Sequence, residues 1–338
     1  MNQSIEQLSG GVKRFIPWLM LAVLIALAVK FISSQYGGPA MLYALLFGMA
    51  FNFLASDEKI ADGIGFTSKG LLKTGVALLG ARITISDIAS LGSFTFLMVL
   101  AGVGVTIGGG WFIARRFGLS HSHAILSAGA VAICGASAAL AISTVLPEDK
   151  DKERNTILTV VGVTSLSTLA MIIYPSCVQF FAMSDQAAGI FLGATIHDVA
   201  QVVGAGYMVS DPAGETATIV KLVRVACLVP VVLMLGAFSP RAEQTDAQQG
   251  TRFRALPLPG FLIVFILIVM ANSFGFIPQT ILLIMSGLSS WLILAAVAAL
   301  GVKTSLQDLV KVGPAPLGVM VLQTLLLAGF VTSWLVLR

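Results

Sequence analysis

The chain alternates long apolar runs with short polar breaks. Its clearest uncharged runs cover residues 15–29, 91–114, 261–285 and 314–337. A run of about 20 apolar residues is long enough to cross roughly 30 Å of hydrocarbon as a helix. These runs are continuous, whereas the strands of a membrane β-barrel alternate apolar and polar positions. The pattern therefore predicts an all-α polytopic membrane protein.

About eleven hydrophobic segments can be delimited, which predicts about 10–11 transmembrane helices. They cover residues 15–34, 39–55, 63–82, 91–114, 122–146, 155–182, 187–209, 214–238, 257–275, 279–301 and 314–337. Two hydrophilic stretches interrupt them, a charged loop at 147–155 and a polar linker at 239–254. The linker separates a larger front part from a three-helix tail but marks no soluble domain. Residues 1–338 are therefore expected to form a single transmembrane domain.

The sequence also contains an ungapped internal repeat. Residues 76–92, "VALLGARITISDIASLG", match residues 297–313, "VAALGVKTSLQDLVKVG". In this alignment Gly80, Arg82, Thr84, Asp87 and Gly92 correspond to Gly301, Lys303, Ser305, Asp308 and Gly313. An odd number of segments separates the copies, so they would face opposite sides of the membrane, as in the inverted-topology repeats of secondary transporters. Convergence on a helix, cap and helix pattern is the alternative.

The composition agrees with a bilayer-embedded chain and limits its partners. It is 57% hydrophobic and 11% charged, whereas soluble domains carry about 25% charged residues. The basic residues behind the net charge of +4 are scattered at helix ends without interleaved aromatic residues, which argues against nucleic-acid binding. Cys134, Cys177 and Cys227 lie in apolar segments without metal-ligand spacing, as small buried hydrophobes do. Neither a metal nor a cofactor is expected.

The basic residues give a conflicting orientation if every segment spans the membrane. Lys13/Arg14, Arg115/Arg116 and Arg241/Arg252/Arg254 would then share one side, which the positive-inside rule makes cytoplasmic. The same count places Lys150, Lys152 and Arg154 outside. The conflict disappears if segments 122–146 and 187–209 are broken or re-entrant and do not cross fully.

Ionisable side chains within apolar segments mark candidate functional positions, because burying one in the bilayer centre costs at least about 2.5–3.5 kcal/mol. Lys69 and Lys73 share one helix face, which suits an anion or an acidic partner opposite; snorkelling towards the interface is the alternative. Gly135, Ala136 and Ser137 interrupt a bulky pattern, so the segment can unwind and point N–H groups at an anion. Close helix packing through small residues explains them equally well.

Two further clusters lie in later segments. His197, Asp198 and Gln201 occur within "GATIHDVAQVVGAG"; Asp198 would carry a coupling proton and His197 would switch charge near neutral pH, unless the cluster only holds helices together. Lys221 and Arg224 lie one turn apart and suit an oxyanion, unless they pair with Asp198 or an interface residue. Cations outnumber carboxylates in the segment interiors, which favours an anionic ligand.

Four motifs carry a resemblance to a known family. In order they are "KTGVALLGARITISDI", "AICGASAALAI", "GATIHDVAQVVGAG" and "IVKLVRVACLVPVV". Together they resemble the YeiH-like family of bacterial membrane proteins, often called sulfate exporters, over almost the whole chain. The family usually has Glu where Asp198 stands, and commonly Thr where Val223 stands. The resemblance implies a bacterial inner-membrane, multi-pass protein of the sodium/proton antiporter and bile-acid transporter group, with an inverted repeat whose discontinuous helices cross near the midplane.

These observations favour a secondary transporter that moves a small anion, such as sulfate or a related sulfur oxyanion, by alternating access with proton or cation coupling. The expected substrate-binding residues are Gly135, Ala136, Ser137, His197, Gln201, Lys221, Arg224 and Lys73. Asp198, with His197, is expected to bind the coupling ion. The expected partners are the small anionic substrate and the lipid bilayer.

Other functions remain open at this point. A passive anion channel and a non-transporting membrane sensor or scaffold are the alternatives. An intramembrane enzyme using Ser137 or Cys134 with His197 and Asp198 is disfavoured, because adjacent His and Asp residues on one helix do not easily form the orienting hydrogen bond of a catalytic triad. The small residues of Gly104 to Gly108 would serve packing within the chain or a homodimer equally well.

Overall fold

The computed structural model describes residues 2–56, 58–147, 149–237, 260–304 and 312–337. The structure is 87% helical, and its described part contains no strand. Within these ranges, six helical stretches are long and apolar enough to span a membrane: Pro17–Tyr36, Gly92–Arg116, Lys152–Phe180, Asp211–Ala237, Gln279–Lys303 and Pro314–Val336. The predicted all-α polytopic membrane fold is therefore confirmed. The predicted polar linker at 239–254 lies outside the described residues.

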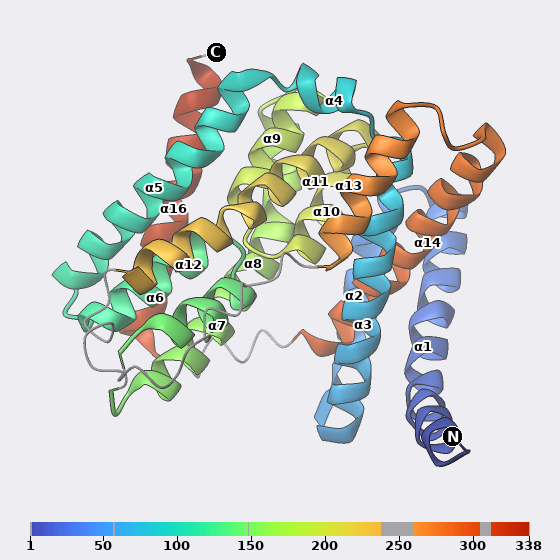
Figure 1. Ribbon diagram of the computed structural model, residues 1–338, viewed down its shortest axis with the longest axis horizontal. Coiled ribbons are helices and arrows are strands. Elements are labelled where there is room, and N and C mark those ends of the chain that lie inside the picture. The colour runs from blue at the N-terminus through green and yellow to red at the C-terminus, as the bar shows by residue number, and fades with distance from the viewer. Residues whose placement is uncertain (1, 57, 148, 238–259, 305–311, 338) are drawn as a thin grey trace.

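One group of helices forms what we call the panel, on the right of Figure 1. It comprises α1 (Asn2–Tyr36), α2 (Ala40–Ala50), the 3-10 helix η1 (Asn52–Ser56), α3 (Glu58–Leu79), the 3-10 helix η2 (Gly80–Arg82), α13 (Gly260–Ser273) and α14 (Gln279–Lys303). The long helix α14 is central, because it packs against α1, α2 and α3.

The other helices form what we call the hairpin bundle, on the left of Figure 1. It comprises α5 (Gly92–Arg116), α6 (His121–Ala132), α7 (Ala136–Val145), α8 (Lys152–Phe180), α9 (Asp185–Thr195), α10 (Val199–Val209), α11 (Asp211–Ala226), α12 (Leu228–Ala237) and α16 (Pro314–Val336). The short helix α4 (Ile85–Ser90) bridges the two groups at the upper end of the molecule (Figure 1). Within the bundle, α11 packs against α9 and α10, while α5 packs against α6 and α16.

The structure agrees with an inverted repeat. Helices α3 and α14 run antiparallel, since α3 ends at the upper end of the molecule and α14 ends at the lower end (Figure 1). The Asn272 amide donates to the carbonyl of Ala81 at 3.0 Å, and the Asn52 amide donates to that of Val302 at 2.9 Å. Ala81 and Val302 are corresponding positions of the repeat. The repeat members Ser305 and Asp308 lie outside the described residues.

Two repeat-related glycines explain why helices approach so closely in the panel. A Cβ on Gly301 would collide with the backbone of α2, and a Cβ on Gly80 would collide with the Phe265 carbonyl of α13. The pairs α2 with α14 and α13 with η2 therefore meet at backbone distance, once at each end of the panel. Since any side chain would force them apart, glycine is required at both positions.

The two interrupted segments fold as re-entrant hairpins. The Ser210 hydroxyl, after α10, donates to the Asp185 carboxylate at the start of α9 at 2.7 Å, so both ends of the α9–α10 hairpin lie together. In the other hairpin, Gly129 of α6 lies against Ile142 of α7. Each segment therefore returns to the side from which it entered, and the discontinuous helices do not cross the molecule as the resemblance implied.

The hairpins resolve the conflict in the basic residues. With α6–α7 folded back, the beginning of α8 lies at the lower end of the molecule in Figure 1, with the end of α5 and the beginning of α1. Lys150 lies just before α8, and Lys152 and Arg154 belong to its first turn. Arg115 and Arg116 are the last residues of α5 and share this end. Lys150, Lys152 and Arg154 therefore no longer contradict a single orientation of the protein in the membrane.

Candidate functional site

The first hairpin turns at Gly135, between α6 and α7. Its φ of +64° and ψ of −124° lie in a region that residues with a side chain avoid. The Gly135 N–H bonds to the carbonyl of Ala130 at 2.8 Å and closes the end of α6. No side chain caps α7, so the N–H groups of its first turn remain available to a ligand.

The second hairpin turns at Ile196 to Asp198, between α9 and α10. Asp198 is the N-cap of α10, and its carboxylate accepts a hydrogen bond from the Ala200 N–H at 2.8 Å. The hydroxyl of Ser167, on α8, accepts from the N–H groups of His197 and Asp198 at 3.2 and 3.0 Å. One serine of a neighbouring helix thus fixes the position of the hairpin tip.

Lys221 and Arg224 of α11 join the two tips, and we call this pair the cationic clamp. The Lys221 ammonium donates to the carbonyls of Ile133 at 2.8 Å and Ile196 at 2.9 Å. The Arg224 guanidinium donates to Ala132 at 2.6 Å and Ile196 at 3.0 Å, and also to Val131. The acceptors stand at the C-terminal ends of α6 and α9, where the helix dipole is negative. The clamp therefore holds both hairpin tips on one helix.

A cavity of about 370 Å³, which we call the lower cavity, lies between the panel and the hairpin tips. Its polar lining consists of Lys69 and Ser68 of α3, Thr164, Ser165 and Thr168 of α8, Asp198 before α10, and Lys303 and Thr304 at the end of α14. The first residues of α7 and α10 also line it, through Ala136 and Ala200. The uncapped N-terminus of α7, the hydroxyl groups and the ammonium groups are donors of the kind that bind a small anion, whereas Asp198 already caps the N-terminus of α10.

The structure separates the predicted site residues into four groups. Ala136 and Asp198 line the lower cavity. Gly135, His197 and Gln201 are buried at the hairpin tips or behind them. Lys221 and Arg224 bond to backbone carbonyls and do not line the cavity. In this structure they therefore do not contact the space for an anion directly, as the sequence had suggested they would. Ser137 and Lys73 are exposed and do not line this cavity either.

The buried members of the second cluster have partners on other helices. His197 Nε2 bonds with the Thr324 hydroxyl of α16 at 3.0 Å, and the Gln201 amide donates to the Thr168 hydroxyl of α8 at 2.7 Å. His197 Nδ1 and Gln201 Oε1 are buried without a hydrogen-bond partner. These contacts attach the second hairpin to α8 and α16.

Sequence reasoning missed several lining residues. Thr164 and Ser165 of α8 lie four and three residues before Thr168, and this helical spacing is the signal that would have found them. The repeat aligned Lys303 with Arg82, but the sequence position of Lys303 did not show that it lines a cavity. Lys69 was considered together with Lys73 and left out of the predicted site. Only the packing of α3 shows which lysine faces the cavity.

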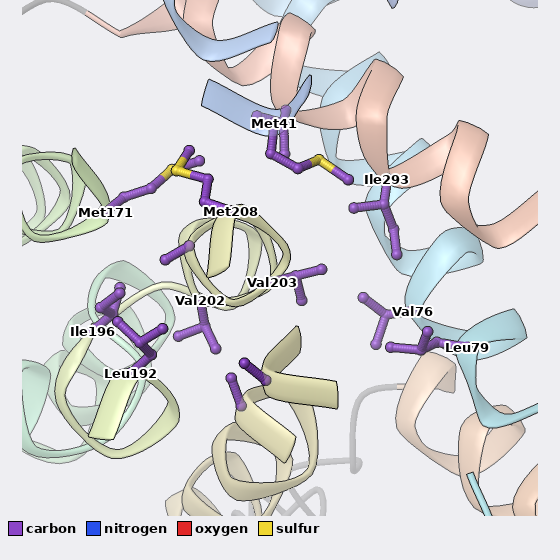
Figure 2. Close-up of a cluster of buried hydrophobic side chains, with 14 of the residues drawn as sticks. Met41, Val76, Leu79, Met171, Leu192, Ile196, Val202, Val203, Met208 and Ile293 are labelled. Carbon is purple, nitrogen blue, oxygen red and sulfur yellow. The ribbon is translucent and has the colours of Figure 1, made fainter. Parts of the chain in front are cut away.

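A second cavity of about 280 Å³, which we call the upper cavity, lies at the other end of α10. Its lining includes Lys30, Met41, Arg82, Tyr207, Asp211 and Leu294. Arg82 and Lys303, which correspond in the repeat, therefore line cavities at opposite ends of the same interface. On α14, Leu294 lines the upper cavity and Ala296 lines the lower one. Figure 2 shows the apolar side chains between α10 and the panel, including Val76, Val203 and Ile293.

Comparison with known proteins places the chain in a family. The model of the family "Conserved hypothetical protein 698" matches residues 17–320. The chain is 49% identical over 319 residues to UPF0324 membrane protein CT0845 of Chlorobaculum tepidum, covering 94% of this chain and 88% of that protein. The chain belongs to the UPF0324 membrane protein family.

Other members of the UPF0324 family are similar over nearly their full length. UPF0324 membrane protein TauZ of Paracoccus denitrificans is 45% identical over 325 residues, which cover 96% of this chain and 95% of that protein. TauZ of Paracoccus pantotrophus is 45% identical over 328 residues, covering 96% of each chain. The family match spans both hairpins and the cationic clamp. Membership and the six candidate spans make this a multi-pass membrane protein.

Proposed function

We propose that this UPF0324 protein is a secondary transporter and that the lower cavity is its site for a small anion. One observation carries the proposal: the uncapped N-terminus of α7 faces a cavity that Lys69 and several hydroxyl groups also line. Helix N-termini and ammonium groups both attract negative charge, and a cavity inside the bilayer strengthens that attraction. The apolar positions Leu72, Leu140 and Val161 on the same walls limit the contact with water.

The two cavities support alternating access as the mechanism. They open towards opposite ends of the interface between the panel and the hairpin bundle, and apolar side chains separate them (Figure 2). A displacement of the bundle along the panel would close one cavity and open the other. A passive channel needs a continuous polar path instead, which the apolar layer interrupts. We therefore favour a transporter over a channel.

We propose a sulfur oxyanion as the substrate class. The sequence motifs resemble the sulfate exporters of the YeiH-like family and, through them, the sodium/proton antiporter group. The relatives named TauZ carry a taurine-related name, which adds an aminosulfonate to the candidates. The cavity volume of about 370 Å³ accommodates either a bare oxyanion or a small organic sulfonate. We place the protein in the bacterial inner membrane on the same resemblance.

Ligand stabilisation of the purified protein tests this proposal first. Thermal unfolding would be followed with sulfate, sulfite, thiosulfate, taurine and chloride at equal ionic strength, and any stabilising anion would then be used in counterflow with proteoliposomes. An exchanger accumulates labelled anion against unlabelled anion, whereas a channel does not. A protein that no anion stabilises and that gives no flux would favour a sensor or scaffold. We propose that the protein is not an enzyme; hydrolysis of a supplied compound by the purified protein would contradict this.

Lys69 and Lys73 provide a matched pair of variants on one helix. Lys69→Gln removes a cation that lines the cavity, so the apparent affinity for the anion is expected to fall about tenfold, the effect of one charged hydrogen bond. Lys73→Gln removes the same charge one turn further along α3, outside the cavity lining. Its affinity should remain close to that of the unmodified protein. Equal losses in both variants would show that overall charge, and not this cavity, decides binding.

A further inference from the structure

The carbonyl oxygens at the two hairpin tips converge on the cationic clamp. Ile133 and Ile196 are the C-caps of α6 and α9, and Val131 and Ala132 belong to the last turn of α6. The final carbonyls of a helix have no partner within it and stand at the negative end of its dipole. Here two such helix ends, from hairpins that enter from opposite sides, direct their oxygens at one place.

This arrangement of oxygens is chemically a site for a monovalent cation. Backbone carbonyls and half-helix C-termini coordinate small cations in membrane proteins, because their partial negative charges replace the hydration shell. In this chain Lys221, with 0% of its surface exposed, donates to one carbonyl of each hairpin. Among the described residues, no carboxylate lies within 4.0 Å of either clamp residue. The carbonyls are thus the direct partners of this charge.

We propose that the hairpin tips form a monovalent-cation site whose occupant is the chain's own Lys221 ammonium. The tethered ammonium shares the neutralisation of both helix ends with Arg224, since Lys221 bonds to Ile133 and Ile196 while Arg224 bonds to Ala132 and Ile196. The site therefore does not take up Na⁺ or K⁺ from solution during transport. Removing the Lys221 side chain empties the site and makes it available to a free cation of similar size.

Replacing Lys221 by alanine tests the site directly. Methylammonium reproduces the end of the lysine side chain and fits the space that the substitution leaves. Lys221→Ala is expected to unfold at a lower temperature than the unmodified protein in choline chloride, and methylammonium chloride at equal ionic strength should recover a large part of the difference. The lower cavity provides an entry path, since Ala136 and Asp198 in its wall adjoin the two tips.

Two controls separate this site from general effects of salt. Lys221→Met removes the charge but fills the space, so methylammonium should not stabilise it. The unmodified protein, with the site occupied, should respond equally to choline and methylammonium. Equal responses of all three proteins, or no response of Lys221→Ala, would overturn the proposal. If Lys221→Ala does not fold in choline, recovery of folded protein when it is expressed and purified with methylammonium supports the proposal, and failure to recover overturns it.

A second measurement concerns transport and stands apart from stability. Anion counterflow by the unmodified protein should be the same in media based on Na⁺, K⁺ or choline. The proposal would be contradicted if counterflow by both the unmodified protein and Lys73→Gln required Na⁺ and if Na⁺ also raised their unfolding temperature. The site would then bind Na⁺ and not the lysine. Since the stability experiment does not require transport, it tests the cation site even if the anion proposal fails.

Discussion

At the scale of single residues, Asp198 combines structural and chemical roles. Its carboxylate caps α10 through the Ala200 N–H and also lines the lower cavity. The backbone N–H of the same residue is held by Ser167. A carboxylate at this place can take up a proton when the cavity opens to water and lose it on the other side. Asp198 is therefore our candidate for proton coupling, with His197 buried directly behind it.

Asp198→Asn separates these two roles. Asparagine caps a helix about as well as aspartate does, so the folded structure and its thermal stability should be retained. Because an amide does not take up a proton, a pH gradient should no longer drive anion flux in proteoliposomes, while counterflow of the anion persists. Gradient-driven flux at the unmodified level would show that another group carries the proton. Loss of both flux and stability would instead indicate that the substitution disturbs the hairpin tip.

At the scale of helices, Arg82 connects the panel to the bundle at the upper end. It follows α3, bonds to Ser290 of α14 at 2.7 Å, and lies 3.9 Å from the Glu215 carboxylate and 4.0 Å from that of Asp211 on α11. Asp211 is largely exposed, with 75% of its side-chain surface accessible, so solvent weakens its attraction to Arg82. This contact therefore ties the panel to the bundle at the upper end only weakly.

Neutralising Asp211 and Glu215 is expected to shift the molecule towards an open upper cavity. Exposed ion pairs contribute at most about 1 kcal/mol each, so the populations should change about fivefold per pair. In a variant without native cysteines, Leu294→Cys in the upper cavity should react faster with a soluble thiol reagent after Asp211→Asn and Glu215→Gln. Leu300→Cys in the lower cavity, on the same helix, should react more slowly. Parallel changes at both positions would indicate loosening of the structure and not alternating access.

At the scale of the whole molecule, the hairpins determine how the protein is oriented in the membrane. Arg115, Arg116, Lys150, Lys152 and Arg154 all lie at the end of the molecule that carries the N-terminus (Figure 1). By the positive-inside rule we expect this end to face the cytoplasm. The last helix, α16, runs to the opposite end (Figure 1), where Trp334 near its end packs against Phe94 near the beginning of α5. The lower cavity would then open towards the cytoplasm.

Reporter fusions in a bacterial host check this orientation. Alkaline phosphatase attached after Arg338 should be active, because it folds only outside the cytoplasm, whereas a green fluorescent protein at the same place should remain dark. Inserted into the 147–151 loop, each reporter should give the opposite result. Fluorescence of the C-terminal green fluorescent protein fusion would show that the orientation is the reverse. If the C-terminal fusions behave as expected but the 147–151 insertions show an active phosphatase and a dark fluorescent protein, then α6–α7 crosses the membrane.

The fold class and the places where its segments are interrupted can be predicted from neighbouring residues alone. Apolar runs long enough to span a bilayer, the break around Gly135 and the break around His197 all arise from neighbours in the chain, so local patterns reveal them. The repeat containing Gly80 and Gly301 was equally visible, because it is a property of the residue order. The charge conflict even indicated that two segments do not cross, although it did not show that they fold back as hairpins.

Which polar groups meet depends on how the helices pack, and the order of residues does not show it. Lys69 and Lys73 are nearly equivalent in sequence, yet α3 packs so that the first lines the lower cavity and the second does not. Lys221 and Arg224 looked like ligands for an anion, but the fold brings two helix C-termini against them. A cation bonds to whichever negative group is closest in space. Since those carbonyls come from segments far away in the chain, no local pattern identifies them.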